Sequence, residues 1–172
     1  VSGSKTVTLN CGEYTLSSQI GLRNYTTIGH DAGENFSITE GFNLIIEDGN
    51  FFGITFSAKS TAQKTSRLTV AGGTFSNCEL FAFDYNSKVT INSGVFNGGV
   101  ILSRTRTQHK NSAFKTVVEI NGGNFNSVKC YVRPYHTSMY DEMNIYAGVF
   151  NGCDIRSYNG DCSRLTIGRV GD

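Results

Sequence analysis

The 172-residue chain is poor in proline, tryptophan and charge. It has one proline, no tryptophan and only 17% charged residues, while 38% of its residues are hydrophobic. A disordered tail or a coiled coil would carry far more charge, so both classes are excluded. No stretch approaches the roughly 18 consecutive apolar residues of a membrane-spanning helix. The length and composition therefore predict one folded domain with no membrane span.

The chain also has no large excess of positive or negative charge. Fifteen Lys+Arg stand against 14 Asp+Glu, giving a formal charge of +1, so no bulk attraction to nucleic acid is expected. The chain begins with Val1 rather than methionine, which we interpret as a mature or excised product, and this leaves secretion open.

Cysteine is scarce and irregularly spaced, and its positions do not form a disulfide framework or a metal-binding pattern. We expect no metal and no cofactor. A bridge between Cys153 and Cys162 stays open as an alternative to free thiols. The five cysteines are Cys11, Cys78, Cys130, Cys153 and Cys162.

Glycine and aromatic residues are abundant, with 20 glycines and 12% aromatics, which is typical of strands and turns. Several segments repeat one pattern: apolar residues seven and five positions before an aromatic, and a glycine two positions before it. This pattern predicts a half-buried strand, a glycine-assisted turn and an inward aromatic. The copies are Leu44–Phe51, Leu68–Phe75, Val89–Phe96, Val118–Phe125 and Met143–Phe150, with Val7–Tyr14 as a sixth.

The repeated aromatics are 24, 21, 29 and 25 residues apart, which indicates one solenoid coil per repeat. The leucine signature and helix of a leucine-rich repeat are missing. We therefore predict an all-β fold, a single-stranded right-handed parallel β-helix of about seven coils over residues 1–172. Within it, residues 1–40 form irregular opening coils, residues 41–163 regular coils and residues 164–172 an incomplete last coil.

The opening segment Gly12–Gly29 resembles the first coil of pectate-lyase-like right-handed parallel β-helices. The repeated Ile-x-x-Gly-x-Phe is similar to the coils of secreted bacterial surface proteins and phage tail spikes. The resemblance implies this architecture and an extracellular, cell-surface or virion location. It does not imply one function, because many unrelated functions use the same fold.

Stacked coils repeat at about 4.8 Å, so residues at equal offset from the aromatic form columns. The columns three, five and seven positions after the aromatic are small or apolar and are predicted to face inward, with Cys78, Cys130 and Cys153 as small buried side chains. One position after the aromatic, asparagines are predicted to form a ladder with Ser76 above it; they are Asn97, Asn126 and Asn151.

The columns six and eight positions after the aromatic are predicted to point outward, and they mix aromatics with arginine. Exposed aromatic and arginine side chains are typical of recognition surfaces, so we interpret this strip as a site for a glycan or a protein partner. The alternative is that a neighbouring loop or another subunit covers it. The candidate ligand-binding residues are Phe81, Phe83, Arg104, Tyr131, Arg133, Arg156 and Tyr158.

A polysaccharide lyase or glycoside hydrolase, with its site at the basic loops of residues 104–142, is an alternative function. Hydrolysis needs two carboxylates about 5–9.5 Å apart. Glu79 and Asp154 share a column but lie three coils apart, or roughly 14 Å. The acidic cluster with which lyases of the resembled family bind calcium is also missing. We therefore expect no catalytic residue and favour a non-catalytic structural and recognition module.

The last residues, 164–172, begin a further coil with Leu165 and Ile167 at the apolar positions and stop before an aromatic. An uncapped coil leaves an unpaired strand edge. This edge leaves three interpretations open: the chain is a fragment of a longer protein, a partner covers its last coil, or copies of the chain stack end to end. This suggests a second alternative function, a self-assembling fibre subunit that forms a homo-oligomer.

Overall fold

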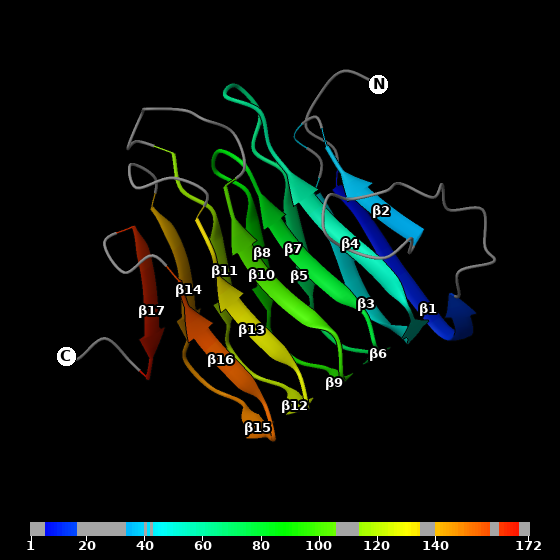
Figure 1. Cartoon of the computed structure of the whole chain (residues 1–172). Helices are drawn as coiled ribbons and strands as arrows, with labels where there is room; N and C mark the ends of the chain where they lie inside the picture. Colours follow the sequence, from blue (N-terminus) through cyan, green and yellow to red (C-terminus); the bar gives the residue numbers. More distant parts are fainter. Residues whose placement is uncertain are drawn as a thin grey trace.

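The chain forms a parallel β-solenoid in which every described element is a strand (Figure 1). The described part has no helix long and apolar enough to cross a membrane. The predicted fold class, all-β with stacked parallel strands, is therefore confirmed. The computed structural model describes residues 6–16, 34–39, 41, 43–105, 114–134, 140–158 and 162–168.

Successive turns contribute the strands in a fixed order. The opening segment provides β1 (Thr6–Leu16) and β2 (Glu34–Ile38), and the first regular turn β3 (Asn43–Phe52) and β4 (Ile54–Lys59). The next two turns provide β5 (Arg67–Val70), β6 (Thr74–Ser76), β7 (Glu79–Phe83), β8 (Lys88–Ile91), β9 (Val95–Asn97) and β10 (Val100–Arg104). The last strands are β11 (Val117–Ile120), β12 (Asn124–Asn126), β13 (Lys129–Val132), β14 (Asp141–Ile145), β15 (Val149–Asn151), β16 (Asp154–Ser157) and β17 (Ser163–Ile167).

The strands assemble into two parallel sheets. One has six strands in the order β2-β4-β7-β10-β13-β16, and it forms the front layer of Figure 1. The other follows the path β15-β12-β9-β6-β3-β5-β8-β11-β14-β17, with β1 paired to β3. The long strand β3 joins the two arms of this second sheet because it pairs with both β5 and β6.

The core is a stack of aromatic rings surrounded by aliphatic columns. Phe51, Phe75, Phe96, Phe125 and Phe150 lie one above another, with neighbouring ring centroids 4.8, 4.8, 4.8 and 4.5 Å apart. The first four are at most 2% exposed. Burying one such side chain contributes about 1.5–3 kcal/mol, so the stack stabilises the whole axis. The prediction of inward aromatics is confirmed.

The glycine two positions before each aromatic is required by the turn. Gly94 has φ +129°, and a Cβ there would lie 3.1 Å from the Phe96 ring and 3.2 Å from the Gly73 carbonyl oxygen. A side chain at this position would be strained by its backbone conformation and would also crowd the previous turn. The close approach of each aromatic to the backbone therefore depends on glycine.

The asparagine ladder is present as predicted. The Asn126 side-chain amide donates to Asn97 Oδ1 over 3.0 Å, and that of Asn151 donates to Asn126 Oδ1 over 3.0 Å. Each of these side-chain amides is hydrogen-bonded to the asparagine of the neighbouring turn, which fixes the register of successive turns.

Cys78, Cys130 and Cys153 have free thiols. Cys78 and Cys130 are buried on inward columns, as predicted, and desolvation raises their pKa to about 11 and about 12. They are therefore poor nucleophiles. Cys153 is free, so the alternative of a bridge between Cys153 and Cys162 is wrong. Cys153 donates instead to the Phe125 carbonyl oxygen at 3.3 Å, which keeps its sulfur on the inward column.

The solenoid has about five turns, from β3 to β16, whereas the sequence predicts about seven. The difference lies at the two ends. The pairing of β1 with β3 shifts register between Leu9 and Asn10 and again between Asn10 and Thr15, so this segment does not add a regular turn. At the other end β17 adds one strand, paired with β14.

Candidate functional site

The outer face of the six-stranded sheet carries the predicted candidate residues in the predicted columns. Phe81, Leu102, Tyr131 and Arg156 are neighbours across β7, β10, β13 and β16. In the next column, Phe83 lies between Lys59 and Arg104. The repeat therefore gives the correct register, but the two halves of this face differ in exposure.

The half of the face on β7 and β10 is buried. Phe81 is fully buried and Phe83 and Leu102 are each 3% exposed, so the prediction that these aromatics are exposed is wrong. They form an apolar cluster of their own, separate from the solenoid core, with Val100 and Tyr131 packed against it. The rings of Phe81 and Phe83 lie 4.9 Å apart. The physical reason is that large apolar side chains on neighbouring strands gain by leaving water together. Arg104, beside Phe83, is half-buried.

The half of the face on β13 and β16 holds a bonded group of polar and aromatic side chains, which we name the Tyr-Arg cluster. Its members are Tyr131, Arg133, Asp154, Arg156 and Tyr158. The Tyr131 hydroxyl donates to Asp154 Oδ2 at 2.8 Å, and Arg156 Nε donates to Asp154 Oδ1 at 2.6 Å. One carboxylate therefore holds a tyrosine and an arginine in fixed positions.

Tyr158 completes the cluster through its ring. The rings of Tyr131 and Tyr158 lie 5.5 Å apart and are nearly perpendicular, at 88°. The guanidinium carbon of Arg133 lies 5.8 Å from the centre of the Tyr158 ring, within the range of a cation–π contact. Arg133 and Arg156 are exposed, and both tyrosines are half-buried. The cluster thus presents two guanidinium groups and parts of two tyrosine side chains to solvent.

The charges of the cluster reinforce its hydrogen bonds. The hydrogen bonds from Tyr131 and Arg156 lower the pKa of Asp154, so this carboxylate is ionised at neutral pH. Desolvation and the bond to Asp154 raise the pKa of Tyr131 to about 12, so its hydroxyl keeps its proton and donates. The same carboxylate raises the pKa of Arg156. The sequence indicates Asp154 only as half of a carboxylate pair, although its position two residues before Arg156 places both side chains on the same face of the strand.

Among the described residues, the two carboxylates that share a column of the six-stranded sheet have two strands between them. Glu79 and Asp154 share a column and are separated by Val100 and Lys129, as predicted. Glu79 accepts a hydrogen bond from the Thr55 hydroxyl at 2.9 Å. The described residues hold no group of three or more His, Cys, Asp or Glu that would bind a metal. Much of the basic loops, residues 106–113 and 135–139, lies outside the described residues.

Asp141 is a buried acid that the sequence did not single out. Its carboxylate accepts from the Thr105 amide at 2.8 Å, the Thr105 hydroxyl at 2.6 Å and the Thr116 hydroxyl at 2.8 Å. Desolvation raises its pKa, although these bonds act in the opposite direction. The hydrogen bonds of this carboxylate join three turns. Because Asp141 is fully buried, its carboxylate is closed to substrate. Its neighbour Glu142 points away to Lys115, at 3.1 Å.

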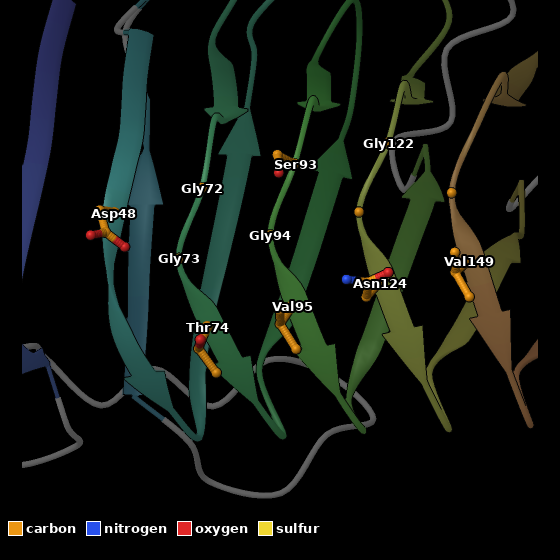
Figure 2. Close-up of a pocket in the computed structure, with 12 residues that line it drawn as sticks. Asp48, Gly72, Gly73, Thr74, Ser93, Gly94, Val95, Gly122, Asn124 and Val149 are labelled. Carbon is orange, nitrogen blue, oxygen red and sulfur yellow. The ribbon is translucent and has the colours of Figure 1, made fainter.

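A shallow groove of about 610 Å³ runs along the axis where the glycine turns lie one above another (Figure 2). Figure 2 shows Thr74, Val95, Asn124 and Val149 in line on successive turns beside these glycines. Asp48 is the one charged residue of its lining, and the lining has no aromatic ring. The groove therefore offers few side chains that would anchor a ligand, and the Tyr-Arg cluster is the better candidate site.

Comparison of the chain with family models, curated proteins and solved structures finds no match. The parallel β-solenoid is shown by the strand pairing of the chain itself. Membership of the pectate-lyase-like superfamily stays a prediction from the sequence resemblance.

Proposed function

We propose that this chain is a non-catalytic structural and recognition module that contacts a glycan or a protein partner through the Tyr-Arg cluster. We place it in an extracellular, cell-surface or virion assembly. The observation that supports this most directly is the cluster itself, in which one carboxylate holds half-buried Tyr131 and exposed Arg156 on a regular sheet, beside Tyr158 and Arg133. Aromatic and arginine side chains dominate the binding energy of most recognition surfaces.

The solenoid favours binding because it fixes the cluster before a ligand arrives. β13 pairs with both β10 and β16, so the strands that carry the cluster have neighbours whose register is regular. Tyr131 and Arg156 are already ordered by Asp154, so little side-chain entropy is lost on binding. The opposite face of the same strands packs in the core through Cys130 and Ile155, which holds the backbone in place.

A binding screen of the purified chain against varied glycans and candidate surface proteins tests this proposal. We expect the chain to bind at least one probe. We expect Tyr158→Ala to weaken this binding about tenfold or more, because the ring supports Arg133 and faces Tyr131. The matched control is Lys59→Ala, since Lys59 is an exposed cation on the column of Phe83 at the other end of the sheet. Equal losses in both variants, or binding to no probe, would contradict the proposal.

A self-assembling fibre subunit is a second candidate, favoured by the last turn. Inward columns that are buried in earlier turns are only partly buried there, at Phe150, Ile155 and Leu165. In the described chain, β15, β16 and β17 each end a strand path, and exposed Val149 and Ile167 are 53% and 67% accessible. A second copy stacked on this face would extend the strand ladders and cover these side chains.

Light scattering and electron microscopy over a range of concentrations test this second candidate. We expect the chain to assemble as its concentration rises. We expect Ile167→Lys to abolish this assembly, because a charge would be buried against the next copy. Thr69→Lys is the control, since Thr69 lies on an outward column in β5, away from this face. A monomer at every concentration would remove the fibre candidate.

A further inference from the structure

The Tyr-Arg cluster lies on a face with uncompensated positive charge. The outward residues of β13 and β16 and those directly following them include the bases Lys129, Arg133 and Arg156 against the acid Asp154. Three bases less one acid leave a surplus of two positive charges. The whole chain has a formal charge of only +1, so this surplus is local.

The surplus is available to a ligand. Lys129 and Arg133 are exposed, and neither forms a salt bridge with an acid among the residues that the structure describes. Arg156 bonds Asp154 through Nε, and its side chain is still 60% exposed. Arg133 is held near the Tyr158 ring, which orders the guanidinium without neutralising it. Within the described part of the chain these two exposed cations are thus outside any salt bridge, although Lys129 lies near enough to Asp154 to interact with its charge.

The tyrosines define what kind of anion fits between these cations. Tyr131 and Tyr158 are perpendicular, so the edge of one ring meets the face of the other. A sugar ring has an apolar face of C–H groups that packs against an aromatic ring, and hydroxyls that bond to polar neighbours. A simple anion would use the cations alone. A charged sugar uses the cations and the tyrosines together.

We propose that the Tyr-Arg cluster, with Lys129, recognises a carbohydrate chain bearing carboxylate or sulfate groups. Arg133 and Lys129 bind the anionic groups, Tyr131 and Tyr158 contact the sugar rings, and Asp154 acts as a positioning residue for Tyr131 and Arg156. This proposal rests on the proposed function and narrows its ligand class.

Titration calorimetry with a matched pair of probes tests the ligand class. The probes are a β-1,4-linked hexamer of glucose and the same hexamer in which every sugar is glucuronic acid, with a sulfated glucose hexamer as a third. We expect both acidic hexamers to bind about tenfold or more tightly than the neutral one, and to weaken as salt is raised.

Three variants locate the site. Arg133→Ala weakens the acidic hexamers about tenfold, and Arg133→Gln does the same while keeping the length of the side chain. Lys59→Ala removes an equal charge from the same sheet outside the cluster and leaves binding unchanged. Equal losses in the Lys59 and Arg133 variants would overturn the proposal, because binding would then follow net charge and not the cluster.

The remaining outcomes separate this inference from the proposed function. Equal binding of neutral and acidic hexamers, lost in Tyr158→Ala, overturns the charge selection and keeps the recognition module. A single-stranded RNA hexamer that binds as tightly as the acidic sugars, and is lost in the same variants, overturns saccharide selectivity. Binding of no saccharide, together with a protein partner that Tyr158→Ala releases, overturns the glycan proposal alone. Binding of no probe at all overturns both.

Discussion

The two halves of the outer face of the six-stranded sheet occupy the same columns and behave differently. On β7 and β10, Phe81 and Leu102 are at most 3% exposed and form an apolar cluster. On β13 and β16, the same column holds half-buried Tyr131 and exposed Arg156, which are held by Asp154. The repeat thus fixes where a side chain points, while its chemistry decides whether it is buried to stabilise the fold or presented to solvent.

The largest expected effect is the loss of stability when each half is truncated. Phe81→Ala removes a fully buried ring, and we expect it to lower the free energy of unfolding by about 3–5 kcal/mol. Arg156→Ala on the same column removes an exposed ion pair, and we expect a much smaller loss because solvent screens it. Denaturant unfolding of both variants measures the difference. Similar losses would show that the two halves do not differ in their role.

Two aspartates extend the comparison of buried and exposed environments to pH. Desolvation raises the pKa of Asp141, so its contribution to stability is present at low pH and declines as the pH rises through that raised value. Hydrogen bonds lower the pKa of Asp154, so its contribution is present above the ordinary value near 3.8 and declines as the pH falls through the lowered value. The two groups therefore act with opposite sign.

Unfolding of Asp141→Asn and Asp154→Asn across the acid and neutral range measures this opposition. Relative to Asp141→Asn, the unsubstituted chain should lose stability as the pH rises. Relative to Asp154→Asn, it should lose stability as the pH falls below about 4. Asp141→Ala is the stronger change, with an expected loss of about 3 kcal/mol, because Thr105 and Thr116 keep buried donors without an acceptor. Parallel pH profiles for the two Asn variants would contradict the assignment.

Periodicity explains which features the sequence predicted. The aromatic stack, the asparagine ladder and the columns of the six-stranded sheet follow from residues that recur once per turn. The features it missed depend on residues that occur once. Burial of Phe83 depends on its large neighbour Phe81, and the roles of Asp154 and Asp141 depend on bonds between different columns or between separate turns.

The smallest effect concerns the single bond that joins Tyr131 to Asp154. Tyr131→Phe removes only the hydroxyl, and we expect a stability loss of about 1 kcal/mol, the usual contribution of one hydrogen bond. Alkaline titration followed by tyrosine absorbance reports the same bond in another way. Because desolvation and Asp154 raise the pKa of Tyr131 to about 12, one phenol should ionise well above the ordinary value near 10.

Asp154→Asn separates the two causes of that late titration. Loss of the carboxylate removes its charge and its preference for the protonated phenol, while the partial burial of Tyr131 is unchanged. The late phenol should then shift toward the ordinary value without reaching it. An unchanged titration would mean that burial alone sets the pKa, and that Asp154 does not position Tyr131. In that case the exposed half of the sheet would depend on packing as the buried half does, and the difference between them would be one of exposure only.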